Sequence, residues 1–101
     1  MSKASLNGKV VAITGAGSGI GRALAQRAAK GGAKLALSDW NEAGLAETVA
    51  LLGSGVETQT AKVDVSDRAA VGQWAADVVE HFGVVNMLIN NAGVTVTGDF
   101  E

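Results

Sequence analysis

Short runs of apolar residues alternate along the chain with longer amphipathic stretches. The four runs are Lys9–Thr14, Lys34–Ser38, Thr58–Val63 and Val84–Asn90. The first is continuously apolar, which is typical of a strand buried on both faces of a sheet. In the third run polar residues alternate with others, as on an edge strand. The pattern therefore predicts four strands.

The three stretches between the runs have helical spacing. Their apolar stripes are Ile20, Leu24 and Ala28; Leu45, Val49 and Leu52; and Val71, Trp74, Ala75, Val78, Val79 and Phe82. The expected N-caps are Asn41 and Ser66, and the expected stops are Gly31–Gly32, Gly53 and Gly83. Strands that alternate with helices imply right-handed crossovers and a parallel sheet. We therefore expect an α/β fold with a parallel sheet of about four strands and helices on both faces.

Composition narrows the chemistry that these elements can carry. Of the 101 residues, 48% are hydrophobic and 18% charged, which is typical of a globular domain. The formal net charge of −2 offers no basic surface for nucleic acid. The chain has no cysteine, no tyrosine and one histidine, His81, so we expect no metal site and no phenolic acid. No run reaches the roughly 18 apolar residues of a membrane span, so we expect a soluble, cytoplasmic protein.

The loop after the first strand is rich in glycine. It reads Thr14-Gly15-Ala16-Gly17-Ser18-Gly19-Ile20-Gly21-Arg22 and leads directly into the first helix. Glycines leave backbone N–H groups bare at a helix N-terminus, where the helix dipole attracts anions, so the loop predicts phosphate binding rather than a tight turn alone. It is not a Walker loop, because no Gly-Lys-Ser/Thr follows, and G-x-G-x-x-G is not met in register. The loop instead matches the pattern T-G-x-x-x-G-x-G.

This motif, with three later ones, resembles the N-terminal half of the short-chain dehydrogenase/reductase family. The later matches are Asp39, Asp64-Val65 and Asn90-Asn91-Ala92-Gly93, each at the carboxyl end of a predicted strand. The resemblance covers nearly the whole chain. It implies that residues 1–101 form the dinucleotide-binding half of a Rossmann domain, with the strands in the order 3-2-1-4. It also implies an oxidoreductase that moves a hydride between nicotinamide and an alcohol or carbonyl substrate.

The resemblance implies a set of cofactor contacts at the carboxyl edge of the sheet. They are Gly15, Ser18, Gly19, Ile20, Gly21, Asp39, Trp40, Asp64, Val65, Asn91, Ala92 and Gly93. Asp64 and Val65 would face adenine, although Asp64 could instead help to start the next helix. The segment Asn91 to Gly93 would line a ribose and brace the first loop through Thr14, or be structural only.

Asp39 can accept hydrogen bonds from the adenosine ribose hydroxyls, and its carboxylate would repel a 2′-phosphate. The family places a compensating base at positions that here hold Ser18 and Trp40, so we expect NAD rather than NADP. Arg22 lies inside the first helix, where we expect its guanidinium to point to solvent. Trp40 could flank adenine or cover a strand end. We expect Trp74 in the core and His81 as a last-turn cation.

The family's catalytic tyrosine, lysine and serine have no counterpart in this sequence, so we assign no catalytic residue. We expect the chain to be truncated, to keep only the ADP-ribose half-site and to be inactive alone. Met87, Leu88 and Ile89 should face both sides of an unpaired edge strand, which favours pairing with another copy and a homo-oligomer. The alternatives are a non-catalytic nucleotide-binding module and a fragment that self-associates or misfolds.

Overall fold

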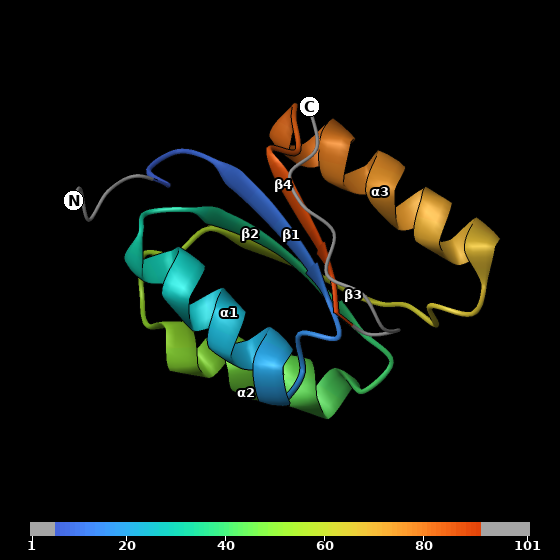
Figure 1. Cartoon of the computed structure of the whole chain (residues 1–101), viewed down its shortest axis with the longest axis horizontal. Helices are drawn as coiled ribbons and strands as arrows, with labels where there is room; N and C mark the ends of the chain where they lie inside the picture. Colours follow the sequence, from blue (N-terminus) through green and yellow to red (C-terminus); the bar gives the residue numbers. More distant parts are fainter. Residues whose placement is uncertain (1–5, 92–101) are drawn as a thin grey trace.

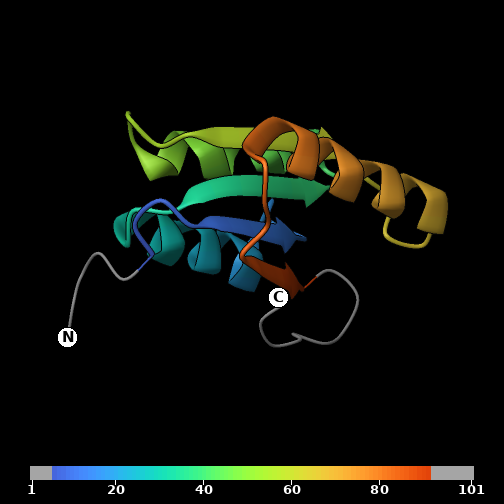
Figure 2. The same cartoon turned by 90° about the horizontal axis from the view of Figure 1, so that it is seen from above.

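The chain forms a parallel sheet between two layers of helices. A computed structural model describes residues 6–91, in which the strand order is β3-β2-β1-β4 (Figure 1). The elements are β1 (Val10–Thr14), α1 (Gly19–Lys30), β2 (Lys34–Asp39), α2 (Glu42–Leu52), β3 (Thr58–Lys62), α3 (Arg68–Phe82) and β4 (Met87–Asn90). All three strand pairs are parallel, and Figure 2 shows β3 and β4 at the two edges. The predicted fold class and strand order are confirmed.

The sheet is buried on both faces at β1, which explains why its sequence is continuously apolar. Helices α1 and α2 cover one face, and α3 lies on the other (Figure 1). Val11 and Ile13 pack in the cluster beneath α1 and α2, whereas Val10 and Ala12 pack beneath α3. Alternate residues of a strand point to opposite faces, so one strand supplies both cores.

Helix α1 meets the sheet mainly through small residues, and the predicted stripe is correct except at Ile20. The buried positions are Gly21, Ala25 and Ala28, whereas Ile20 is 67% exposed. Ala28 is therefore buried as predicted and Leu24 packs against the same core, but Gly21 is buried in place of the expected Ile20. Small side chains let the helix backbone approach β1 closely, which a search for large apolar residues does not detect.

One of the two predicted N-caps is correct. Asn41 is the N-cap of α2, and its Oδ1 accepts the Gly44 N–H at 3.0 Å. The predicted cap Ser66 is wrong, because Asp67 is the N-cap of α3 and accepts the Ala70 N–H at 3.1 Å. Aspartate and serine are about equally good caps, so sequence alone left the choice between adjacent residues open.

Strand β4 is shorter than predicted, since Val84 to Asn86 lie before its first residue. Asn86 nevertheless pairs with Val10: its N–H donates to the Val10 carbonyl at 2.9 Å, and its Oδ1 accepts the Val10 N–H at 2.8 Å. Met87 and Ile89 pack on the α1 side and Leu88 on the α3 side, as predicted. On the α3 side a groove of about 580 Å³ lies between α3 and strands β1 and β4, lined partly by Val71, Val79 and Leu88.

Candidate functional site

The glycine loop connects the carboxyl end of β1 to the N-terminus of α1, as predicted. Gly15 and Gly19 have φ angles of +66° and +56°, a left-handed conformation that side chains other than glycine rarely adopt. Gly21 is required for a different reason, because a Cβ there would lie 2.1 Å from the Gly15 carbonyl oxygen. Ser18, Gly19 and Ile20 are exposed. The loop therefore folds tightly against α1 and leaves its outer residues accessible.

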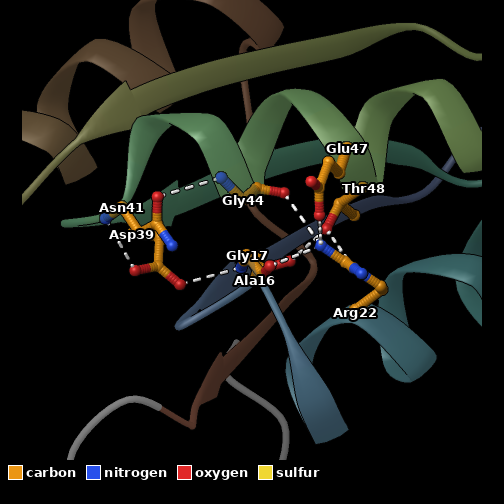
Figure 3. Close-up of polar contacts among 8 residues, drawn as sticks. All are labelled: Ala16, Gly17, Arg22, Asp39, Asn41, Gly44, Glu47 and Thr48. Carbon is orange, nitrogen blue, oxygen red and sulfur yellow. Dashed lines mark hydrogen bonds and ion pairs between the residues drawn. The ribbon is translucent and has the colours of Figure 1, made fainter.

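Asp39 ends β2 beside this loop. Its Oδ2 accepts the Gly17 N–H at 2.8 Å, and its Oδ1 accepts the Asn41 N–H at 3.0 Å (Figure 3). A Cβ on Gly17 would lie 2.8 Å from Oδ2, so only glycine lets the carboxylate approach this closely. Two backbone bonds thus fix the orientation of the carboxylate. Each oxygen keeps lone-pair capacity for a further donor, such as a ribose hydroxyl.

Arg22 does not point to solvent, and that prediction was wrong. Its side chain is 24% exposed, and its Nη2 donates to the carbonyl oxygens of Gly17 at 2.6 Å and Gly44 at 3.2 Å. Its Nε donates to Thr48 Oγ1 at 2.9 Å (Figure 3). Packing α2 against α1 creates this environment, because the acceptors outside the loop come from α2.

The end of β4 braces the loop from the other side. Asn91 Nδ2 donates to the Gly15 carbonyl at 3.3 Å, while the contact to Thr14 comes from its neighbour: Thr14 Oγ1 donates to Asn90 Oδ1 at 3.1 Å. The predicted brace is therefore shared between two asparagines rather than made through Thr14 by Asn91. Ala92 and Gly93 lie outside the described residues.

Asp64 and Val65 follow β3 on the same edge of the sheet. Asp64 Oδ1 accepts both the Ser66 hydroxyl at 2.7 Å and the Ser66 N–H at 2.9 Å. These two bonds hold the pKa of the Asp64 carboxyl below its usual value. Val65 is 38% exposed. Asp64 thus shapes the turn before α3, as the structural alternative supposed, and its carboxylate remains exposed.

Trp40 and Lys62 form an exposed pair next to Asp39. The Lys62 Nζ lies 4.3 Å from the centroid of the Trp40 ring, which is an indole–ammonium contact. Trp40 is 62% exposed. Lys62 is also the β3 residue in register with Asp39. The strand position paired with Asp39 therefore carries a cation, which the sequence motifs did not predict.

The other two aromatic predictions concern residues away from the glycine loop. Trp74 is 4% exposed and lies in the α3 core, as predicted, and its Nε1 has no hydrogen-bond partner among residues 6–91. His81 lies in the last turn of α3, with its Nε2 3.9 Å from Glu57 Oε2. Since α3 returns the chain to the amino edge of the sheet, His81 is at the edge opposite to the loop.

The assembled edge can bind an anion and neighbouring hydroxyls. Glycine N–H groups at a helix N-terminus suit phosphate, and a fixed carboxylate beside them suits ribose. Among residues 6–91, no three His, Cys, Asp or Glu side chains gather as a metal site would require. No helix in that part of the chain is long and apolar enough to cross a membrane.

Three residues shape this edge in roles that the sequence did not predict. Thr48 is completely buried, Gly44 packs against the Gly17 carbonyl, and Arg22 links both helices to the loop. The sequence does indicate that Thr48 is buried, because this polar residue lies beside Leu45, Val49 and Leu52 on the apolar side of the second predicted helix. Nothing in the sequence indicates the contacts of Arg22, since helical spacing does not show which neighbouring element an arginine will contact.

Known proteins share both the sequence and the architecture. The short chain dehydrogenase family model matches residues 9–101. The putative oxidoreductase SadH of Mycobacterium tuberculosis is 49% identical over 98 residues, which cover 96% of this chain and 36% of that protein. Human 15-hydroxyprostaglandin dehydrogenase [NAD(+)] is 43% identical over 100 residues, covering 95% of this chain and 37% of that protein. The chain thus spans just over a third of the length of these relatives.

A solved structure gives the same result. A short chain dehydrogenase/reductase from Burkholderia phymatum, in complex with NAD, is 47% identical and superposes with a TM-score of 0.83. The match covers 93% of this chain and 33% of that one.

Proposed function

Because the chain belongs to the short-chain dehydrogenase family, we propose that its protein is an NAD-dependent oxidoreductase to which these residues contribute the ADP-ribose-binding half-site. The reaction is hydride transfer between nicotinamide and a small alcohol or carbonyl compound. The observation that carries this proposal is the bond between Gly17 N–H and Asp39 Oδ2, because it joins a ribose-binding acid to a phosphate-binding loop.

Each predicted contact has a place in this proposal. The loop from Gly15 to Gly21 receives the pyrophosphate at the N-terminus of α1. Asp39 accepts the adenosine ribose hydroxyls, and Asp64 and Val65 face adenine, with Trp40 on its flank. Asn91, Ala92 and Gly93 line the second ribose. The exposed Ile20, in the first turn of α1, is covered by the bound dinucleotide.

We propose NAD rather than NADP as the cofactor. A 2′-phosphate would meet the Asp39 carboxylate, a like-charge contact that costs about 1 to 4 kcal/mol near a protein surface. Lys62 is the cation in register with Asp39, but its ammonium contacts the Trp40 ring. The NAD complex of the Burkholderia relative supports this choice.

The test is a calorimetric titration of NAD into the chain. We expect a dissociation constant between about 1 mM and tens of micromolar, with ADP-ribose binding about as well as NAD. Asp39→Ala should weaken NAD about tenfold and raise the NADP/NAD affinity ratio, whereas the exposed Asp77→Ala should change neither. A lack of heat with NAD up to millimolar concentration, or an unchanged ratio in Asp39→Ala, would contradict the proposal.

We also propose that the 101 residues alone do not turn over substrate. They contain no tyrosine, so they supply no phenolic proton donor for the alcohol. Formation of NADH by the purified chain with simple secondary alcohols would refute this. A cytoplasmic location stays a prediction.

A second candidate function is a non-catalytic nucleotide-binding module that self-associates through β4. What favours it is the position of β4, at an edge among the described strands and next to the 580 Å³ groove. A dimer in sedimentation velocity that Leu88→Lys dissociates would support it, and this association underlies our proposal of a homo-oligomer. A monomer at all concentrations would exclude the β4 pairing.

A further inference from the structure

The Arg22 guanidinium binds three neutral acceptors and one charged one. The neutral acceptors are the carbonyl oxygens of Gly17 and Gly44 and the hydroxyl of Thr48. The charged acceptor is Glu47 Oε1, at 3.1 Å (Figure 3). The Arg22 side chain is 24% exposed, but that of Glu47 is 71% exposed. An ion pair with so exposed a partner contributes little, so the neutral acceptors determine where the guanidinium lies.

Two successive peptide groups of the glycine loop are held from this side. The Ala16 carbonyl accepts the Thr48 hydroxyl at 2.7 Å, and the same hydroxyl oxygen accepts Arg22 Nε–H. The next carbonyl, that of Gly17, accepts Arg22 Nη2–H at 2.6 Å. Arg22 therefore fixes the second carbonyl directly and orients the group that fixes the first.

A trans peptide group is planar, and its N–H points opposite to its C=O. The Ala16–Gly17 group shows the consequence: its carbonyl faces Thr48, while the Gly17 N–H faces Asp39. The same geometry applies to the Gly17–Ser18 group. With its carbonyl held by Arg22, the Ser18 N–H is directed away from α2, at the residue that immediately precedes the first turn of α1.

We propose that Arg22 is a positioning residue for phosphate binding. By holding the Gly17 carbonyl, it presents the Ser18 N–H to the anion before the ligand arrives. The Thr48 bond performs the same task for the Gly17 N–H toward Asp39. This inference rests on the proposed function, because the anion is the pyrophosphate of a dinucleotide. Arg22 itself does not touch the ligand in this arrangement.

Lysine at this position separates charge from geometry. A lysine ammonium carries the same charge but lacks the planar fork, so it cannot bind the Thr48 hydroxyl through one nitrogen and both carbonyls through another. Arg22→Lys should therefore lose the positioning effect while keeping the charge. Arg27→Lys is the matched control, since Arg27 lies on the same helix and is exposed.

The experiment is a titration of the chain with ADP and, separately, with adenosine, followed by amide NMR. In Arg22→Lys we expect ADP to bind about tenfold more weakly, while adenosine changes by less than about twofold. The amide signals of Gly17 and Ser18 should shift in the ligand-free variant, a change that lost global stability would not localise. Arg27→Lys should leave both affinities and both signals unchanged.

Each outcome decides a separate point. If the wild-type chain binds neither ligand, the proposed function fails. If it binds ADP, and Arg22→Lys binds ADP equally well or loses adenosine in equal proportion, Arg22 does not position the phosphate site. A second variant, Arg22→Gln, covers the case in which lysine misfolds. Collapsed spectra in both variants would make Arg22 a general requirement for folding and would overturn the positioning role.

Discussion

Gly21 provides the sharpest test of how the loop and α1 pack. It lies in the third position of α1, where alanine would ordinarily be preferred by about 1 kcal/mol. The structure predicts the opposite sign for Gly21→Ala. The added Cβ would lie 2.1 Å from the Gly15 carbonyl oxygen, 2.8 Å from its carbonyl carbon and 2.9 Å from Asn91 Nδ2.

These distances set the magnitude. Ordinary van der Waals contact of a Cβ begins near 3.4 Å, so the closest atom is far inside it and belongs to the backbone. Either α1 must move away from β1 or the loop must change its path. Overpacking of this kind costs about 1 to 3 kcal/mol, and a backbone obstacle lies at the upper end. After the gain in helix propensity, we expect the free energy of unfolding to fall by about 2 kcal/mol.

The assay is chemical denaturation by urea, with Gly72→Ala as the control. Gly72 is also a helical glycine, on the exposed side of α3, and a Cβ there meets nothing within 4 Å. This control should gain about 0.5 to 1 kcal/mol from helix propensity alone. The two variants share the same chemical change, so their difference isolates the steric contact at Gly21.

The second readout is affinity for NAD. Because the Gly21 clash falls on the glycine loop, the stability loss should be accompanied by weaker NAD binding, whereas Gly72→Ala should bind NAD normally. A Gly21→Ala protein as stable as Gly72→Ala, with unchanged affinity, would refute the packing described here.

Two further predictions concern single polar side chains. Thr48→Val should lower the free energy of unfolding by about 1 to 3 kcal/mol in urea denaturation, because it strands the buried Ala16 carbonyl; a change below about 0.5 kcal/mol would contradict this. Ser66→Ala should raise the pKa of the Asp64 carboxyl toward its usual value, as measured by NMR titration, because the Ser66 hydroxyl is its largest stabilising contact. A depressed pKa in the folded state stabilises the protein above the ordinary aspartate pKa, and that stability is lost on acidification through the depressed value, so Ser66→Ala should also reduce the loss of stability in acid. An unchanged Asp64 pKa in Ser66→Ala would show that the hydroxyl bond is not made.

Hydrophobic periodicity was sufficient to predict the helices and strands and their order along the chain. A strand with consecutive apolar residues, such as Val10 to Ile13 of β1, is shielded from water on both faces only when helices cover both sides of the sheet. The glycine loop and Asp39 could likewise be placed, because parallel strands bring their carboxyl ends to one edge of the sheet. These features depend on local sequence and on rules of chain connection, both of which are present in the amino-acid order.

The contacts between elements could not be predicted in this way. Whether Arg22 faces water or α2 depends on how α1 and α2 pack side by side, and the spacing of residues within α1 does not contain that information. The division of the brace between Asn90 and Asn91 depends on the register of β4, which a one-residue shift would reverse.

A parallel α/β sheet, with a glycine-rich loop and an acid at its carboxyl edge, follows from the amino-acid order alone. Helix packing is what brings the half-buried Arg22 and the buried Thr48 against the back of the loop, although periodicity assigns both to ordinary helix faces. Period and propensity act within one element, whereas a hydrogen bond from α1 to a carbonyl of α2 exists only after both helices have packed on the same sheet.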